Sequence, residues 1–536
     1  VLEQARKQGV DGGRLDSFSA QLSPRTEPPN TGGVSPPQDL LNSLLGHYQN
    51  GRLSDAEKLA VEITQQFPKH PFAWKVLGAV LKQKGKISES LTIMEKSVHL
   101  SPSDANTHYN LGVTLKEFGR LDKAKTSFKQ AIAFEPDDAE AHRNLGDVLQ
   151  DLDQLKEAEA SYKTALVLKP NLTEAYSNFG VTLQEIGTLE EAKNSYIKAI
   201  TLKPNLAEAY SNFGVTLQEI GRLEEAEASH YQAIALKPED AKAHNNLGNT
   251  LQALGRLDKA KVNYNQAILL KPDLAEAFWN LHGIQKTIQI AEYWIDKCLE
   301  VDEKYVNGRL TKAALRLYQG DRSKFDELMQ SELKQHPYMR SLSWALSLPD
   351  LPELHFNKFY FFDAVIKKSI VSKPFYEFGV WRASSFKYLI KVFKKGYGFD
   401  TFTGLPENWV FKNGSVAQKA GTYTSDGNVP KIKGGEFIVG KFEDTLPVFF
   451  SETRPIASVI NFDADLYSST ICALNFSKQV MDKDTILIFD ELIINESWEQ
   501  DEFRALSEFC SINNFSYEVI AISFFTKQVA IKLIGI

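Results

Sequence analysis

The stretch VINFDADLYSSTICALNFSKQVMDKDTILIFDEL, from Val459 to Leu492, decides how the last third of the chain folds. Two apolar runs, 459–462 and 485–489, flank a segment with helical character. Continuous apolar runs on either side of a helix are typical of buried parallel strands. The first acids after the runs, Asp463 and Asp490, are 27 residues apart, enough for one right-handed crossover. We therefore predict a strand–helix–strand unit whose two strands are neighbours.

Each of these predicted strands ends in two carboxylates. Asp463 and Asp465 follow the first strand, and Asp490 and Glu491 follow the second. Ligands of open parallel sheets bind beyond the carboxyl ends of the strands, and four acids clustered there would not all stay ionised without a cation among them. Oxygen ligands suit Mg²⁺ better than zinc or copper. The alternative is that these acids are solvated or cap the following helices.

The composition is that of an ordinary globular protein with several domains. The chain has 536 residues, 43% of them hydrophobic, and a net charge of −7, which argues against a general binder of nucleic acid or anionic membranes. Its three cysteines, Cys298, Cys472 and Cys510, are too scattered for a disulfide framework or a thiolate zinc site and indicate a reducing compartment. Because no apolar run reaches the ~18–20 residues that cross a bilayer, and no signal peptide is expected, we predict a cytoplasmic protein.

The N-terminal half repeats itself. Residues 1–36 are rich in Gly, Pro and Ser and are expected to form a disordered leader. Residues 37–274 then repeat every 34 residues in three sets of positions: Pro68, Pro102, Pro136, Pro170, Pro204, Pro238 and Pro272; Gly78, Gly112, Gly146, Gly180, Gly214 and Gly248; Ala124, Ala158, Ala192, Ala226 and Ala260. The pattern resembles the tetratricopeptide repeat, which implies seven helix pairs stacked into an all-α superhelix. Residues 275–342 are expected to be degenerate, capping repeats, and 343–374 a linker with one helix.

A column of asparagines runs through these repeats at one position of the first helix: Asn110, Asn144, Asn178, Asn212, Asn246 and Asn280. Asparagine is a mediocre helix former, so its recurrence needs a reason. The column resembles the asparagine ladder of the repeat arm in O-GlcNAc transferase, which implies that a peptide or protein binds in the groove. The alternative is that each amide bonds to a neighbouring helix and stabilises the superhelix.

Residues 375–536 alternate strands and helices. A strand over 375–378 meets Gly379 in a tight turn before a helix from about Ser384, and a second strand ends at Asp400, where an acid is suited to ribose hydroxyls. The polar segment 410–437 is expected to be a long loop that covers the acceptor. Since no histidine follows His355, Asp465 is the best remaining candidate for a general base.

Five ordered motifs of this domain, EFGVWRASS, FDTFTGLPENW, GKFEDTLPVF, FDADLYSST and FDE, resemble the macrocin O-methyltransferase family over residues 375–510. The resemblance implies a Rossmann-like class I methyltransferase domain, with a mostly parallel seven-stranded sheet whose last strand is antiparallel. It also implies that the domain uses S-adenosylmethionine and Mg²⁺. Two positions depart from the family pattern: Ala383 replaces a glycine, and Glu491 replaces a commoner aspartate.

The resemblance also implies roles for single residues. Glu377, Gly379 and Ser385 would line the methyl donor, with Asp400 on its ribose. Phe402, Phe442 and Glu443 would lie near its adenine. Asp463, Asp490 and Glu491 would bind the metal, and Asp465 would be the base.

The leading hypothesis is an Mg²⁺-dependent O-methyltransferase that acts on a sugar or other hydroxyl acceptor, with a repeat arm that recruits substrate or partner. We expect no nucleic-acid or membrane partner. Two alternatives stay open. One is a glycosyltransferase in which Asp463-Ala464-Asp465 is a metal site for a sugar nucleotide, and the other is a repeat scaffold whose methyltransferase-like domain is inactive.

Overall fold

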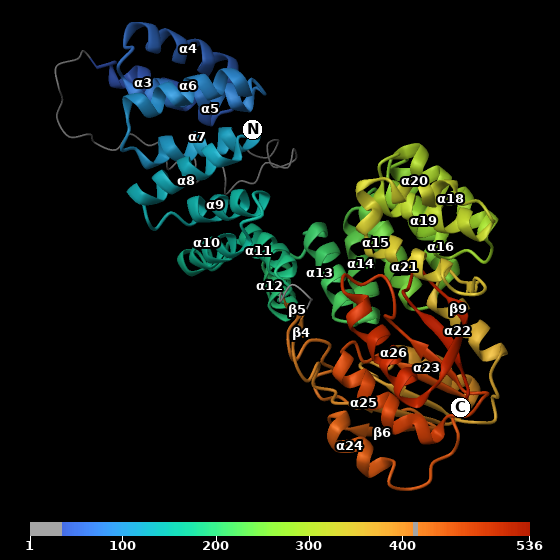
Figure 1. Cartoon of the computed structure of the whole chain (residues 1–536). Coiled ribbons are helices and arrows are strands. Elements are labelled where there is room, and N and C mark those ends of the chain that lie inside the picture. The colour runs from blue at the N-terminus through green and yellow to red at the C-terminus, as the bar shows by residue number, and fades with distance from the viewer. Residues whose placement is uncertain (1–34, 411–415) are drawn as a thin grey trace. The chain divides into compact units, whose positions relative to one another are not determined.

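The computed structural model describes residues 35–410 and 416–536, so most of the expected disordered leader lies outside the described residues. The chain divides into two compact units, Val1–Thr216 and Leu217–Ile536 (Figure 1). The division falls inside the repeat array, not at the predicted start of the last domain. The final repeats therefore belong to the same compact unit as the C-terminal sheet.

The repeats are helix pairs throughout. Within the described residues, seven pairs span the predicted array: α3 (Gln38–Gln49) with α4 (Leu53–Gln66), α5 (Pro71–Gln83) with α6 (Ile87–Leu100), α7 (Ala105–Glu117) with α8 (Leu121–Phe134), α9 (Ala139–Asp151) with α10 (Leu155–Leu168), α11 (Thr173–Glu185) with α12 (Leu189–Leu202), α13 (Ala207–Glu219) with α14 (Leu223–Leu236), and α15 (Ala241–Ala253) with α16 (Leu257–Leu270).

Large side chains explain the recurring glycines. A Cβ atom on Gly146 would lie 2.8 Å from the ring of Tyr162, and one on Gly112 would lie 2.9 Å from the ring of Phe128. Both rings are fully buried, so the ring from the second helix fills the space that glycine leaves on the first. The period of 34 thus records a packing contact that recurs between the two helices of a pair.

Helices continue beyond the array, over the residues that the sequence predicts to be degenerate, capping repeats. They are α17 (Ala275–His282), α18 (Ile288–Val301), α19 (Val306–Tyr318), α20 (Ser323–Met329), the 3-10 helix η1 (Glu332–Gln335) and α21 (Pro337–Leu346). The predicted linker helix is α22 (Lys358–Lys367), whose N-cap Asn357 accepts hydrogen bonds from the amides of Phe359 and Tyr360.

The last domain is built on a mixed sheet whose strands are β1 (Glu353–Leu354), β2 (Phe375–Phe378), β3 (Gly396–Asp400), β6 (Gly435–Val439), β7 (Val459–Phe462), β8 (Ile486–Phe489), β9 (Ser516–Ile522) and β10 (Val529–Ile534). Their order is β1-β9-β10-β8-β7-β2-β3-β6. β7 and β8 are parallel neighbours, as predicted, and β10 is antiparallel to both β8 and β9. The predicted count of seven strands is wrong, because the linker adds β1 beside β9.

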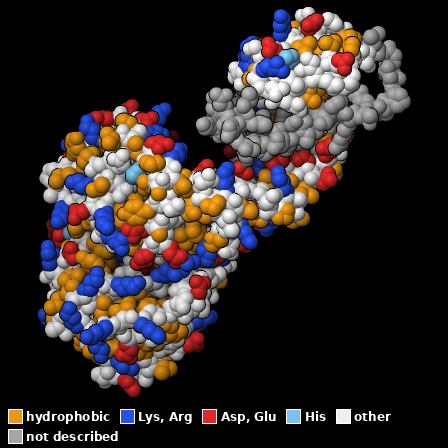
Figure 2. Space-filling view, turned by 180° about the vertical axis from the view of Figure 1, so that it is seen from behind, with side chains coloured by type: hydrophobic (Ala, Val, Ile, Leu, Met, Phe, Trp, Pro, Cys, Tyr) orange, Lys and Arg blue, Asp and Glu red, His pale blue; other side chains and the backbone are white. Residues whose placement is uncertain are grey.

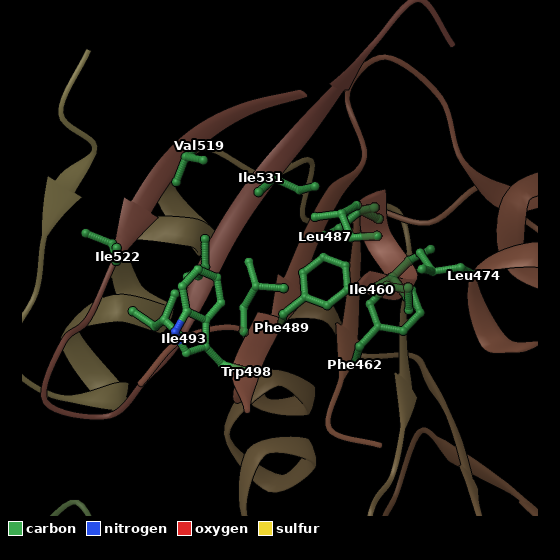
Figure 3. Close-up of a cluster of buried hydrophobic side chains, with 14 of the residues drawn as sticks. Ile460, Phe462, Leu474, Leu487, Phe489, Ile493, Trp498, Val519, Ile522 and Ile531 are labelled. Carbon is green, nitrogen blue, oxygen red and sulfur yellow. The ribbon is translucent and has the colours of Figure 1, made fainter. Parts of the chain in front are cut away.

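Helices cover both faces of this sheet. On one face, α22 and α23 (Ser384–Phe393) pack against Phe375, Val459 and Ile488. On the other, α25 (Tyr467–Ser477), α26 (Glu502–Asn513) and the capping helices pack against the opposite side chains of the same strands. Figure 3 shows part of this second layer, where Phe462 and Phe489 lie among Leu474, Leu487 and Trp498.

Four phenylalanines cross the sheet near the carboxyl ends of its strands. The rings of Phe399, Phe378, Phe462 and Phe489 stack in that order, with centroids 4.8, 5.5 and 5.0 Å apart. They are register partners in four neighbouring parallel strands. This alignment brings the residues that follow them to one rim of the sheet.

The segment 410–437 is not one continuous loop. It contains β5 (Val416–Gln418), which pairs with β4 (Trp409–Val410), and it ends in β6. Residues 411–415 lie outside the described residues. The ring of Tyr423 lies 5.5 Å from that of Trp381, so part of the segment contacts the turn after β2.

None of the described helices is long and apolar enough to span a bilayer. On the face shown in Figure 2, acidic, basic and apolar side chains are interspersed.

One buried histidine departs from the repeat pattern. His230 is fully buried, and neither ring nitrogen has a hydrogen-bond partner among the described residues. Phe128, Tyr162, Tyr196 and Tyr264 occupy the equivalent position in other repeats. Burial lowers the pKa of His230 to about 4, so the folded state binds fewer protons than the unfolded state.

We expect the His230 contribution to stability to be complete above pH 6.5 and to be lost as the pH falls from 6.5 to about 4. The variant His230→Phe should therefore keep about 2–3 kcal/mol of unfolding free energy that the wild type loses between pH 7.5 and 4.5. Urea unfolding at both values measures the difference, with the exposed His99→Gln as control. Equal losses of unfolding free energy in the wild type and in His230→Phe would contradict this prediction.

Candidate functional site

A cavity of about 670 Å³ lies at the carboxyl ends of the parallel strands, within the unit formed by residues 217–536. Small-molecule sites commonly measure roughly 300–1,000 Å³. Three parts of the chain line it: the loops after the strands, the N-terminus of α22, and the last repeats. Of the residues predicted for function, it is lined by Gly379, Ser385, Asp400, Phe442, Asp463, Asp465, Asp490, Glu491 and Asn280.

Gly379 lies where two strands come closest. Its φ is +88°, and a Cβ atom there would lie 1.8 Å from the backbone oxygen of Asp463. No other residue fits this position, because the obstacle is backbone and the conformation favours glycine. Contact between the turns after β2 and β7 therefore depends on this residue.

The Asp400 carboxylate holds the same turn. One of its oxygens accepts hydrogen bonds from the amides of Val380 and Trp381, both at 2.7 Å, and the other accepts from the amide of Phe402 at 2.6 Å. A carboxylate oxygen can accept more than one bond, so the predicted contact with ribose stays compatible with this arrangement. Ala383 has a φ of +62°, a left-handed conformation that glycine adopts more readily than alanine.

The four strand-end acids meet at the rim, as predicted. The amide of Asp490 donates to the backbone oxygen of Phe462 at 2.9 Å, which places the two acidic segments side by side. Burial, and next the charge of Asp490, raises the pKa of Asp463 well above its ordinary value. Burial and then Glu491 do the same to Asp465, and burial raises the pKa of Asp490. Negative charge at this rim is therefore only partly compensated.

Sequence reasoning missed the cations that compensate it. Lys527, in the turn between β9 and β10, forms a 3.0 Å ion pair with Glu491. Lys358, at the start of α22, lines the cavity, and its charge lowers the pKa values of Asp463 and Asp490. Both lysines lie outside residues 375–510, so no motif in that segment pointed to them.

The predicted metal ligands are only partly arranged for a metal. In the described ranges 35–410 and 416–536, no three His, Cys, Asp or Glu side chains form a group that could hold an ion. The oxygens of Glu491 are taken by Lys527 and by Asn495, at 2.7 Å, and Gln528 donates to one oxygen of Asp490. The carboxylate oxygens of Asp463 and Asp490 are ligands of the kind that a hard cation such as Mg²⁺ prefers. For Glu491 to join them, its ion pair must open.

A second layer of acids lies beneath the cavity. Glu377 is buried and does not line it, and one of its oxygens has no hydrogen-bond partner among the described residues. Its register partner Asn461 is buried on β7 with an unpartnered amide. Burial raises the pKa of Glu377 well above normal, and that of Glu502 as well.

Two predicted donor residues lie elsewhere. Phe402 is fully buried against Phe437 in the core, because its backbone carbonyl ties it to the segment around Ser425. Glu443 is exposed in the first turn of α24 (Phe442–Phe449) and forms an ion pair with Lys441. Neither of these two residues lines the cavity, and their position near the adenine stays a prediction.

Aromatic side chains join the last repeats to the C-terminal domain. Cβ atoms on Gly221, Gly255 and Gly283 would lie within 2.8 Å of the rings of Trp381, Phe359 and Phe525, respectively. Gly51, Gly85, Gly119 and Gly187, which occupy the position of Gly221 and Gly255 in earlier repeats, have nothing within 4 Å. The Arg382 guanidinium also donates to the backbone oxygen of Ile220 at 2.9 Å. The last repeats thereby form one wall of the cavity.

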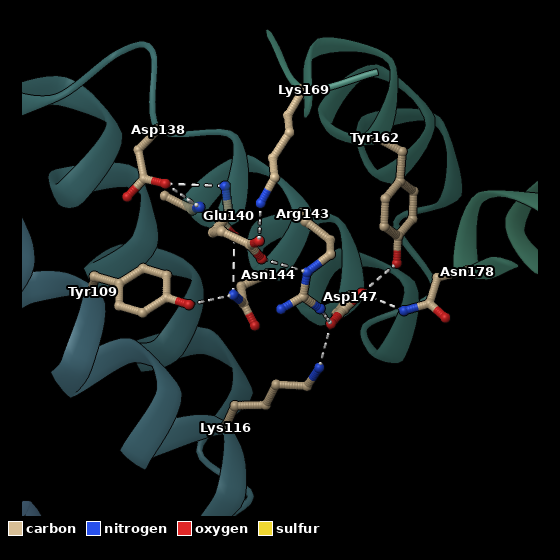
Figure 4. Close-up of polar contacts among 11 residues, drawn as sticks. Tyr109, Lys116, Asp138, Glu140, Arg143, Asn144, Asp147, Tyr162, Lys169 and Asn178 are labelled. Atoms are coloured by element: carbon tan, nitrogen blue, oxygen red, sulfur yellow. Dashed lines mark hydrogen bonds and ion pairs between the residues drawn. The ribbon is translucent and has the colours of Figure 1, made fainter. Parts of the chain in front are cut away.

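Three asparagines of the predicted ladder bond to the preceding repeat. Asn144 donates to the Tyr109 hydroxyl at 3.0 Å and Asn178 to Asp147 at 2.8 Å (Figure 4). Asn280 donates to Asn245 at 3.0 Å. Arg143 and Lys116 complete the charged network around Asp147. These bonds favour the stabilising interpretation at these positions, and peptide binding by the column stays a prediction.

Comparison with protein families identifies the repeats. A model described as TPR repeat matches residues 114–153, 183–221 and 217–255, and two described as tetratricopeptide repeat match 139–172 and 241–274. The N-terminal region is therefore a tetratricopeptide-repeat array. No curated protein matches the chain.

Similar solved structures include YrrB, titled a TPR protein with an unusual peptide-binding site (25% identity, 34% of this chain, 95% of that chain, TM-score 0.31). A second is the APC/C hetero-tetramer Cut9–Hcn1 (17% identity, 52% of this chain, 55% of that chain, TM-score 0.39). A third is PilF of Pseudomonas aeruginosa (19% identity, 39% of this chain, 94% of that chain, TM-score 0.35).

Removing one crowded charge should stabilise the fold. Folding raises the pKa of Asp465. The free energy of unfolding therefore falls as the pH rises from the unfolded-state pKa of this group through its folded-state pKa. We expect Asp465→Asn to unfold at higher urea than the wild type at pH 7.5 in EDTA, with a smaller difference near pH 4. Asparagine also tolerates the φ of +58° at this position.

The exposed Asp444→Asn, in the first turn of α24, is the matched control and should give no gain, because an acid is favourable there. A lower urea midpoint for Asp465→Asn at pH 7.5 would show that the acid cluster does not oppose folding.

Proposed function

We propose that this tetratricopeptide-repeat protein is an S-adenosylmethionine-dependent O-methyltransferase assisted by Mg²⁺. The observation that supports this best is the convergence of the glycine turn after β2, the acid after β3 and the acid pairs after β7 and β8 on one cavity. These are the motifs that resemble the macrocin O-methyltransferases. Their common location supports a shared chemical role.

The methyl donor would lie against the turn after β2. Gly379 leaves room for close approach of a ligand to the backbone, and Ser385 lies in the first turn of α23, where backbone amides are unpaired within the helix. Asp400 borders the same space and is suited to ribose hydroxyls. The unpartnered Glu377 oxygen below adds a buried polar group close to this turn.

Asp463 and Asp490 would hold the cation, with Glu491 joining them once Lys527 is released. When bound, Mg²⁺ supplies a Lewis acid that orients hydroxyl oxygens and lowers a hydroxyl pKa. Lys358 would retain part of the charge balance when the cation is absent.

Asp465 would act as the base. The acceptor oxygen forms a bond to the methyl carbon as the carbon–sulfur bond breaks, and the hydroxyl proton passes to the Asp465 carboxylate. Burial and the neighbouring acids raise the pKa of Asp465, which makes its carboxylate a stronger base than an exposed one. In-line alignment is the main requirement, and the walls of the cavity would provide it.

The family resemblance points to a sugar or glycoside hydroxyl as acceptor, and the repeat groove to a peptide or protein that is recruited. The three cysteines are free thiols, which favours a reducing compartment such as the cytoplasm.

Isothermal titration with S-adenosylhomocysteine and with UDP-glucose tests the donor. We expect the first to bind and the second not to bind. Asp400→Asn should weaken binding of S-adenosylhomocysteine by about tenfold to a hundredfold, since a hydrogen bond to a charged group contributes about 1.5–3 kcal/mol. Asp444→Asn is the control, and circular dichroism checks the fold of each variant. Binding of UDP-glucose alone would favour the glycosyltransferase, and binding of neither would favour the inactive scaffold.

Titration with Mg²⁺ tests the metal independently of turnover. Asp463→Asn should weaken Mg²⁺ binding by tenfold or more, because it removes one negative charge from the proposed ligands. Lys527→Met should strengthen it, because it frees the oxygens of Glu491. If Lys527→Met left the affinity unchanged, Glu491 would not be a ligand.

A further inference from the structure

Residues of the repeats form one wall of the cavity. Gln218, Asn249, Gln252 and Trp279 come from α13, α15 and α17 and line the same space as the strand-end acids. All belong to the compact unit 217–536. A ligand in the cavity therefore contacts the repeat array and the C-terminal domain at once.

The amides of this wall contact two buried hydroxyl groups, those of Tyr264 and Thr250. The Tyr264 hydroxyl lies 2.8 Å from one polar end of the Asn249 amide and 2.8 Å from one polar end of the Gln252 amide. A hydroxyl has one hydrogen to donate, so one of these two amides must present its NH₂ group to Tyr264. The Thr250 hydroxyl lies 2.8 Å from the Gln218 amide. Each amide therefore has one polar end at a hydroxyl group and its other polar end free for the cavity. Across the described part of the chain, these three side chains make no other hydrogen bond.

Two of these residues interrupt the pattern of the array where the cavity begins. Asn249 occupies a position held by Asp147, Val181 and Val215 in the preceding repeats. Trp279 occupies a position held by Arg143, Ser177, Ser211 and Asn245. The packing of a repeat does not demand these side chains, since other repeats fold without them.

The contrast with an equivalent glutamine is direct. Gln150 also accepts from the tyrosine of its own repeat, Tyr162, but its NH₂ group lies 3.4 Å from a Glu185 oxygen and donates to it. Gln252 has the same position and the same kind of tyrosine contact, yet it faces the cavity.

We infer, on the basis of the proposed function, that Gln218, Asn249 and Gln252 form the acceptor subsite and that the repeats select what is methylated. The three amides offer hydrogen-bond donors and acceptors that match the hydroxyl groups of a ligand, and the half-buried Trp279 ring offers an apolar face. Four acidic side chains, Asp463, Asp465, Asp490 and Glu491, line the same cavity, so it disfavours an anionic ligand. The subsite therefore fits a neutral, oxygen-rich ring such as a hexose, and it disfavours a uronic acid of the same shape.

Saturation-transfer NMR and isothermal titration with methyl β-D-glucopyranoside, methyl α-L-rhamnopyranoside and methyl β-D-glucuronide test this. We expect at least one neutral glycoside to bind the full-length protein and the glucuronide to bind at least fivefold more weakly. Asn249→Val restores the residue of the preceding repeats and should weaken glycoside binding at least fivefold. Tyr264 still donates to Gln252 in this variant, so the fold should be retained.

Gln150→Ala is the matched control and should bind glycosides as the wild type does. S-adenosylhomocysteine should bind equally well to wild type, Asn249→Val and Gln150→Ala. Wild-type affinity for glycosides in Asn249→Val, stronger binding of the glucuronide, or no binding of any glycoside would overturn the inference. Failure of S-adenosylhomocysteine to bind the wild type would instead contradict the donor assignment, and the glycoside result would be read separately.

Discussion

The site depends on one close approach of two backbones. Gly379 lies against the carbonyl of Asp463 at a distance that excludes any Cβ atom, and this contact joins the turns after β2 and β7. Below it, stacked phenylalanines keep four strands in register. Because both features fix the strand ends at the same height, the acids that follow must share one rim. The clustering of these acids is therefore a consequence of strand register.

Crowding of these acids has a structural cost that other segments offset. Asp463 and Asp465 have raised pKa values because they are buried beside like charges. Lys358 comes from the linker helix and Lys527 from the last turn, so the charge balance of the rim is completed from outside the segment that carries the motifs.

The repeats play two physical roles in one array. In the residues up to 216, polar bonds such as Asn144 to Tyr109 and Asn178 to Asp147 link neighbouring repeats. From residue 217 onward, turn glycines receive aromatic rings from the C-terminal domain, and amides face a cavity. Similar repeat sequences thus have different roles, depending on which segment packs against them.

The sequence by itself determined the elements that local physics controls. The 34-residue period, the apolar runs of β7 and β8 and the glycine after β2 specify helix pairs, buried parallel strands and a tight turn, and each was predictable because its cause lies within a few residues. Only the tertiary structure decided that Lys527 pairs with Glu491, that Phe402 turns into the core and Glu443 to solvent, that β1 extends the sheet, and that Asn249 and Gln252 line the same cavity as the acids. These outcomes arise from contacts between segments tens to hundreds of residues apart, and no local pattern encodes them.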